Sequence, residues 1–109
     1  MIQEKQLGQL RPANTTAASL YSGDVTWVGK CLIVCNTSAA LAKARVFHDA
    51  DGSTYDETTA LFWDMEINPG ESAIIDSFLA GNNSAGNVGV RTDTADALTF
   101  TLYGAELPR

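Results

Sequence analysis

The sequence predicts an all-β fold, an antiparallel β-sandwich of the jelly-roll type with about seven or eight strands. Three observations predict it. Short segments alternate apolar and polar residues, as half-buried strands do. Clusters of Gly, Pro, Asn, Asp and Ser separate these segments. No segment of the 109 residues repeats its apolar residues at the helical spacing. This length suits one domain, and the strand count alone leaves an immunoglobulin-like sandwich as an alternative.

The first fourteen residues differ from the rest of the chain. Residues 1–14 are rich in Gln and Leu and show no regular period. We therefore expect an extended N-terminal arm in residues 1–14 and a sandwich domain in residues 15–109. Three apolar side chains in the arm, Ile2, Leu7 and Leu10, favour its docking on another subunit over a frayed terminus.

The next expected strands are residues 15–21, 25–36 and 41–48. The stretch 25–36 is the most apolar and places apolar residues on both of its faces, as a central strand would. The stretch 41–48 alternates, with three apolar residues on the inner side and two basic residues on the outer side: Ala42, Ala44 and Val46 against Lys43 and Arg45.

The second half of the chain predicts four more strands, at residues 60–67, 72–76, 87–92 and 98–107. The stretch 60–67 alternates, and the residues expected to face the core are Leu61, Trp63, Met65 and Ile67. Asn68, Pro69 and Gly70 predict a tight turn in which the glycine supplies a positive φ. Residues 80–86 are expected to form a loop.

Charge is distributed unevenly along the chain. The net charge is −6, from 7 basic and 13 acidic residues. Residues 1–48 hold five of the bases and two of the acids, and residues 49–109 hold two bases and eleven acids. This acidity argues against a nucleic-acid partner, which needs a basic face. No apolar run approaches the roughly 18–20 residues of a membrane span, so no membrane partner is expected either.

Two cysteines, Cys31 and Cys35, lie in the apolar stretch 25–36. In a strand both would point to one face, about 13 Å apart at roughly 3.3 Å per residue. A disulfide needs Cα atoms within about 7 Å, so we expect two free thiols that behave as small apolar side chains, as in a reducing cytoplasm. Together with the single histidine, His48, they leave a zinc site short of ligands.

Two polar clusters could carry chemistry. His48 with Asp49 and Asp51 could form part of a hydrolytic site, but no Gly-x-Ser-x-Gly elbow supplies a nucleophile. Four acids after His48 could form an irregular calcium site, although the EF-hand spacing fails: Asp49, Asp51, Asp56 and Glu57. We favour surface and turn positions for both clusters. The prediction is a protein that is not an enzyme, with no catalytic residues, no metal and no cofactor.

Six aromatic residues could build a sugar-stacking platform, or could belong to the core or to contacts between subunits: Tyr21, Trp27, Tyr55, Phe62, Trp63 and Tyr103. In a carbohydrate-binding module, Trp63 would need a nearby carboxylate such as Asp64 or Asp56. Packing is the favoured interpretation at this point.

The order of strands and turns resembles the small β-sandwich virion proteins of tailed bacteriophages. The segments that carry the resemblance are Leu20-Tyr21-Ser22, Gly29 to Ser38 (GKCLIVCNTS), Ala44-Arg45-Val46-Phe47, Ile67 to Ser72 (INPGES) and Leu98 to Glu106 (LTFTLYGAE). The resemblance spans about residues 15–107 and provides no catalytic residues to transfer.

The resemblance implies a virion protein that is assembled in the host cytoplasm. It implies a capsid decoration or cement protein, a homotrimer that binds the major capsid protein or other virion proteins and stabilises the shell. The alternative is a carbohydrate- or receptor-binding module of a tail or fibre tip. The residues that we expect at a partner interface are Ile2, Leu7, Leu10, Trp27, Lys43, Arg45, Phe62 and Trp63. We expect the arm and the basic residues Lys43 and Arg45 to lie nearer a partner than the acidic loops do.

Overall fold

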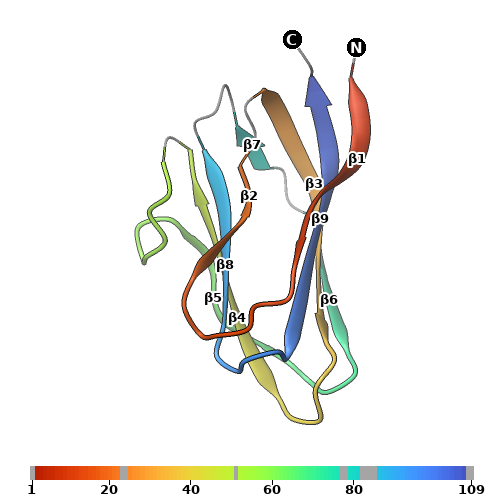
Figure 1. Cartoon of the computed structure of the whole chain (residues 1–109), viewed down its shortest axis with the longest axis vertical. Helices are drawn as coiled ribbons and strands as arrows, with labels where there is room; N and C mark the ends of the chain where they lie inside the picture. The colour runs from red at the N-terminus through yellow and green to blue at the C-terminus, as the bar shows by residue number, and fades with distance from the viewer. Residues whose placement is uncertain (1, 23–24, 51, 77–78, 82–85, 108–109) are drawn as a thin grey trace.

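Two antiparallel sheets face each other in the protein (Figure 1). The computed structural model describes residues 2–22, 25–50, 52–76, 79–81 and 86–107. Within these residues there are nine strands: β1 (Gln3–Leu10), β2 (Ala18–Tyr21), β3 (Thr26–Asn36), β4 (Ala42–Asp49), β5 (Ala60–Ile67), β6 (Ser72–Ile75), β7 (Leu79–Gly81), β8 (Asn87–Thr92) and β9 (Leu98–Leu107). The described part of the chain contains no helix of the length and apolarity that crossing a membrane requires.

The strand order identifies the topology. One sheet, here called the β3–β9 sheet, has the order β1-β9-β3-β6, and the short β7 also pairs with β3. The other, the β4–β8 sheet, has the order β2-β8-β4-β5. The pairs β1·β9, β2·β8, β3·β6 and β4·β5 are nested within one another along the chain. A long hairpin that is rolled up in this way is a jelly roll. The all-β sandwich prediction is confirmed.

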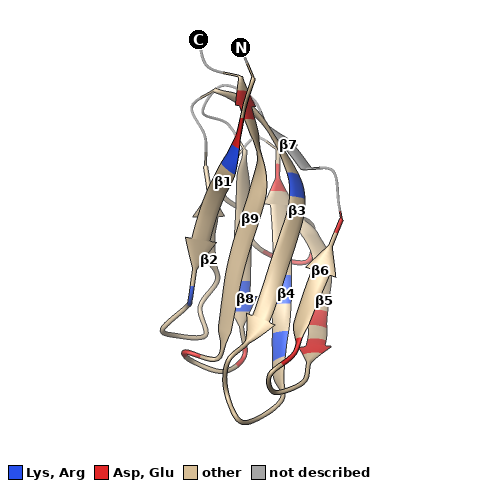
Figure 2. Cartoon of the chain, turned by 90° about the vertical axis from the view of Figure 1, so that its right-hand side faces the viewer, with Lys and Arg blue, Asp and Glu red and all other residues tan. Residues whose placement is uncertain are grey.

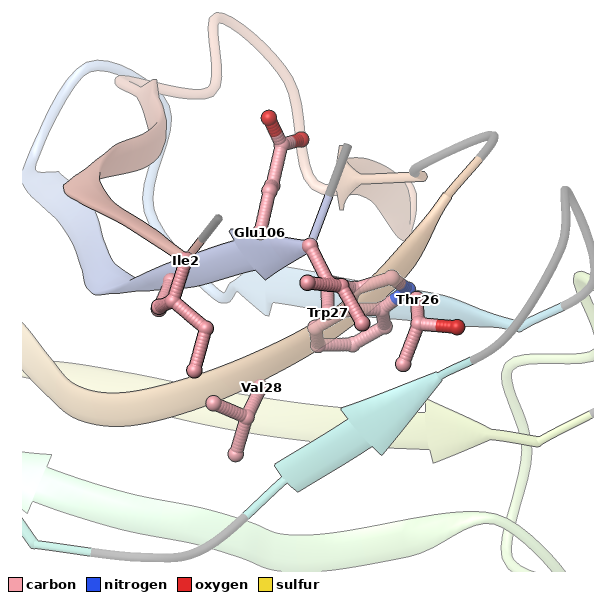
Figure 3. A pocket seen from close by; sticks show the side chains of 7 residues that line it. Ile2, Thr26, Trp27, Val28 and Glu106 are labelled. Carbon is pink, nitrogen blue, oxygen red and sulfur yellow. The ribbon is translucent and has the colours of Figure 1, made fainter. Parts of the chain in front are cut away.

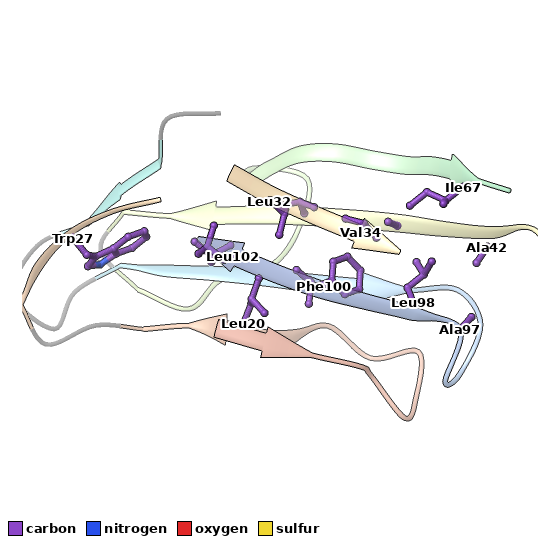
Figure 4. Close-up of a cluster of buried hydrophobic side chains, with 14 residues drawn as sticks. Leu20, Trp27, Leu32, Val34, Ala42, Ile67, Ala97, Leu98, Phe100 and Leu102 are labelled. Carbon is purple, nitrogen blue, oxygen red and sulfur yellow. The ribbon is translucent and has the colours of Figure 1, made fainter. Parts of the chain in front are cut away.

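The core lies between the two sheets and draws on both (Figure 4). Its buried members are Leu20, Trp27, Leu32, Val34, Ala42, Ala44, Val46, Ile67, Val88, Val90, Ala97, Leu98, Phe100 and Leu102. The period-2 pattern read from the sequence places Val88 and Val90 inward, and both are buried. It also places Lys43 and Arg45 on the outer side of β4, where both are only half-buried.

A buried asparagine fixes the end of β3. The Asn36 side-chain amide donates hydrogen bonds to the Ala40 and Ile67 carbonyl oxygens, at 2.9 and 2.8 Å. Its Oδ1 accepts from the Ser38 backbone N–H at 2.9 Å. These bonds satisfy a polar group that would be costly to bury alone, and they connect β3 to the end of β5. The predicted turn that follows β5 is also present, with Gly70 at φ 76°.

The N-terminal segment is part of a sheet. Within residues 1–14, predicted as an extended arm, Gln3–Leu10 forms β1, the edge strand that pairs with β9. Leu7 and Leu10 pack against the core of their own domain. Of the three apolar side chains expected to dock on another subunit, this leaves Ile2 exposed.

The predicted orientation of β5 is wrong for two residues. Met65 and Ile67 face the core as expected, but Leu61 and Trp63 are exposed and Phe62 packs against the core instead. The cause is a pair of β-bulges in the pairing with β4. At one of them Trp63 and Asp64 both lie opposite Arg45, and Asp64 has φ 55°. An extra residue reverses which side chains face inward. The short β7 was also missed, because residues 80–86 were expected to form a loop.

Candidate interaction surfaces

The outer face of the β4–β8 sheet carries an arginine that is stacked on a tryptophan. The Arg45 guanidinium lies 3.5 Å from the centroid of the Trp63 ring. Its Nε and one terminal nitrogen donate to the Asp64 carboxylate at 2.7 and 3.2 Å. These hydrogen bonds lower the pKa of Asp64 below its usual range. The bulge that turns Trp63 outward also places Asp64 beside Arg45, so one backbone irregularity builds the whole arrangement.

A second layer of aromatic rings lies beneath this arrangement. Phe47 is fully buried. The centroid of its ring lies 6.3 Å from that of Trp63, which it meets edge to face, and 6.0 Å from that of Tyr55. Tyr55 packs against the backbone of Gly89, where a Cβ would come within 2.4 Å of the ring. The Tyr55 hydroxyl donates to Asn87 at 3.1 Å. The segment between β4 and β5 is thereby folded back over its own sheet.

Two further bases flank Arg45 on this face. Arg91 on β8 lies directly opposite Arg45, and Lys43 lies two residues away on β4. Among the described residues, neither the Lys43 ammonium nor the Arg91 guanidinium lies within 4 Å of a carboxylate, whereas the Arg45 guanidinium does. The Lys43 backbone N–H donates to the Asp93 carboxylate at 2.8 Å, and Glu66 lies opposite Lys43 on β5. Arg91 donates from Nε to the Thr15 carbonyl oxygen at 2.7 Å. The surface formed by Lys43, Arg45, Trp63, Asp64 and Arg91 is called the Trp63 ledge below.

The outer face of the β3–β9 sheet carries apolar side chains from three strands, with Thr101 opposite Ile33 and Ser72 opposite Cys35. Ile74 on β6 is 67% exposed and pairs with Ile33 on β3. Tyr103 on β9 is 43% exposed and pairs with Cys31. Strands β3 and β9 carry charge only near the end at which the termini lie (Figure 2). The surface formed by Cys31, Ile33, Cys35, Ile74 and Tyr103 is called the Ile74 face below.

Both cysteines lie on this face. They are free and half-buried, as the strand spacing predicts. The pKa of the Cys31 thiol is raised, first by burial and then by the neighbouring Asp76 carboxylate. A thiol with a raised pKa is a poor nucleophile near neutral pH. Cys31 therefore acts as a packing residue in this fold.

A shallow apolar pocket lies at the end of the sandwich where the termini meet (Figure 3). Its volume is about 260 Å³, and it is lined by Ile2, Thr26, Trp27, Val28, Ala105, Glu106 and Leu107. Beside it the Glu106 carboxylate accepts hydrogen bonds from Lys5, at 2.8 Å, and from the Tyr21 hydroxyl. These bonds lower the pKa of Glu106 and connect β1, β2 and β9.

The residues predicted at a partner interface are distributed unequally. The structure brings Lys43, Arg45 and Trp63 together on the outer face of the β4–β8 sheet. Ile2 instead lines the apolar pocket at the end of the sandwich where the termini meet. Trp27 is 2% exposed, so its ring reaches a partner only if the core opens. Like Leu7 and Leu10, Phe62 packs against the core. Sequence reasoning missed Ile33, Ile74 and Arg91, although apolar residues on both faces of residues 25–36 already signalled the first of them.

Three of the residues that were considered for catalysis or calcium binding, His48, Asp49 and Asp56, make contacts within the fold. The His48 ring lies edge-on to Trp27 at 6.0 Å. Asp49 accepts from the Thr54 N–H at 2.8 Å, and Asp56 accepts from the Thr58 N–H at 2.8 Å. Asp51 lies outside the described residues. In the part of the chain that the structure describes, no group of three or more His, Cys, Asp or Glu side chains is placed to hold a metal ion.

Comparison with known proteins identifies a fold and not a family. No protein-family model matches the chain, and no curated protein matches it. The solved structures that resemble it include the T13 IBDV viral particle, with a TM-score of 0.55, 14% identity, and coverage of 95% of this chain and 30% of that one. The structure of infectious bursal disease virus strain Gx aligns at a TM-score of 0.46 and 11% identity, over 96% of this chain and 30% of the viral chain. The structure of strain Gt aligns at a TM-score of 0.40 and 13% identity, over 96% of this chain and 29% of the viral chain. The chain thus spans less than a third of each viral chain.

Proposed function

We propose that this protein is a non-enzymatic structural component of a virus particle, a decoration or cement protein of a bacteriophage capsid. One observation carries the proposal: 95% of the chain superposes on part of a chain from the T13 IBDV viral particle, at a TM-score of 0.55. Its resemblance in sequence order to the β-sandwich virion proteins of tailed phages supports the same role. The protein would then be assembled in the host cytoplasm and reside in the virion.

The surface chemistry is suited to binding other proteins. Trp, Tyr and Arg dominate the energetics of protein interfaces, and the Trp63 ledge presents a tryptophan and two arginines on a rigid sheet. The proposed partners are the major capsid protein or another virion protein, and further copies of this chain in a homotrimer. Lys43 and Arg91 would pair with carboxylates of whichever protein partner covers the ledge, so association through it should weaken as salt rises.

The proposal is tested on particles that carry the gene for this chain. We expect mass spectrometry of gradient-purified particles to detect the protein, and purified protein to bind shells that lack it. Arg45→Gln should weaken that binding. Lys30→Gln is the matched control, because Lys30 is an exposed base on the opposite sheet whose ammonium pairs with Glu4 at 3.2 Å. Absence of the protein from purified particles would refute the proposed role.

A carbohydrate-binding module of a tail or fibre tip is the second candidate. Trp63 is 44% exposed and lies beside the Asp64 carboxylate, as a sugar-stacking site requires. The stacked Arg45, however, occupies one face of the indole ring, which reduces the surface available to a pyranose. Glycan-array binding that is lost in Trp63→Ala, with the oligomeric state unchanged, would favour this candidate over shell attachment.

A further inference from the structure

The Ile74 face needs a cover that the described part of the chain does not provide. An antiparallel sheet that is solvated on one side alternates apolar and polar residues. In β3 that alternation fails, because Ile33 lies on the outer side while Leu32 and Val34 fill the core. Ile74 on β6 and Tyr103 on β9 add to the apolar area, in which Thr101 lies opposite Ile33. An apolar sheet face of this kind indicates a protein interface.

The size and the charge of the two surfaces indicate what covers this face. The molecule measures 43 × 26 × 21 Å, so a broad face offers room for the roughly 800 Å² per partner of a standard interface. Two exposed acids, Glu71 and Asp76, flank Ile74 immediately before and after β6. On the other sheet, the Trp63 ledge offers Lys43 and Arg91, whose side-chain charges form no salt bridge among the described residues. Asp64 and Glu66 are the acids beside them on strand β5.

We propose that copies of this chain associate head to tail, with the Ile74 face of one copy packed on the Trp63 ledge of the next. Ile74 and Tyr103 then meet Trp63, and Glu71 and Asp76 approach the bases of the ledge. The inference rests on the proposed function for its setting, and it names the surfaces through which the subunits of that assembly meet. Each copy carries one surface of each kind, so the contact is heterologous, and it forms a closed ring where the rotation between successive copies closes.

Symmetric pairing of two Ile74 faces is the less favourable arrangement. It would bring the acidic ends of both β6 strands to one interface. The base that strand β3 carries is Lys30, and it already forms an ion pair with Glu4. Head-to-tail packing brings the same acids towards Lys43 and Arg91, whose side chains form no salt bridge among the described residues.

The test is sedimentation equilibrium of the purified protein over a wide concentration range. Ile74→Glu should convert the oligomer into a monomer, because it places a charge in the centre of the buried contact. Leu41→Glu is the matched control, since Leu41 is also exposed but lies outside both surfaces. Circular dichroism and thermal unfolding of each variant confirm that it folds.

A charge exchange then identifies the partner surface. Lys43→Glu with Arg91→Glu should abolish association, and so should Glu71→Lys with Asp76→Lys. All four substitutions in one chain should restore it. The inference is overturned if the wild type stays monomeric, if Ile74→Glu or the ledge pair leaves the oligomer intact, or if the folded fourfold variant does not reassemble. A monomer found in purified particles would overturn this inference alone, and an oligomer absent from particles would overturn only the proposed function.

Discussion

The two outer faces of the sandwich are stabilised in different ways. On the β4–β8 sheet the chain covers its own face: Tyr55 lies on Gly89, Phe47 is buried beneath Tyr55 and Trp63, and Arg45 is stacked above. On the β3–β9 sheet Ile33 and Ile74 lie side by side on the outer face, and Ile74 is 67% exposed. The cover on the first face therefore contributes to the stability of the single chain, whereas the second face lacks such a cover among the described residues and is open to the association that we propose.

The largest expected effect separates the two faces directly. Phe47→Ala removes a fully buried ring and should lower the free energy of unfolding by about 3–5 kcal/mol. Ile74→Ala, on the other face, should change it by less than about 0.5 kcal/mol at concentrations where the chain is monomeric. Urea denaturation of both variants measures the difference. Equal losses would contradict the contrast between the faces.

A close backbone approach gives the next effect. Gly89→Ala introduces a Cβ within 2.4 Å of the Tyr55 ring, and should cost about 1–3 kcal/mol because the ring must move off the sheet. In a Tyr55→Ala background the same substitution should cost much less, since the obstructing ring is gone. A double-mutant cycle by urea denaturation measures this coupling. Additive losses would show that Tyr55 does not rest on Gly89 in solution.

The sequence predicts part of this contrast, and the residues involved show why the rest escapes it. Strand β4 keeps its period of two from Ala42 to Val46, so Lys43 and Arg45 could be placed outward from the sequence. Strand β5 contains bulges, and a bulge depends on pairing with a distant strand, so Trp63 was predicted on the wrong side. The two adjacent aromatic residues Phe62 and Trp63 were the available sign that the alternation breaks there.

The cover over the β4–β8 sheet was beyond sequence reasoning for a similar reason. Gly89 reads as an ordinary weak position within a strand. Its role becomes visible only when Tyr55, 34 residues earlier, is seen to lie on it. The jelly-roll order likewise follows from pairings such as β1 with β9, which no local pattern encodes. Local alternation predicts strands and faces, while contacts between distant segments decide which face is covered.

The ion pair on the ledge predicts a smaller effect that depends on pH. Asn tolerates the positive φ of Asp64, so Asp64→Asn removes the charge and preserves the bulge. The hydrogen bonds from Arg45 lower the pKa of Asp64. Such a carboxylate stabilises the fold above its unfolded pKa of about 4, and that stability is lost as the pH falls through the lower folded value.

The difference in stability between the wild type and Asp64→Asn should therefore be constant near neutral pH and shrink below about pH 4. Thermal unfolding across this range measures it. In an Arg45→Gln background the pH dependence of the difference should largely disappear, because its main cause is gone. If the stability difference between the wild type and Asp64→Asn stayed constant below about pH 4, that result would contradict the Arg45–Asp64 interaction.

The smallest expected effect concerns the thiol on the Ile74 face. Alkylation proceeds through the thiolate, and burial followed by Asp76 raises the pKa of Cys31. In a Cys35→Ser background, iodoacetamide should react with Cys31 more slowly in the folded chain than in urea, and Asp76→Asn should accelerate the folded reaction a few-fold. The difference that remains between the alkylation rates of the folded Asp76→Asn chain and the unfolded chain then measures the effect of burial alone. Raising the protein concentration should slow the alkylation of Cys31 further, because a second copy that packs on the Ile74 face covers the thiol. An alkylation rate that is independent of protein concentration would show that the face stays bare.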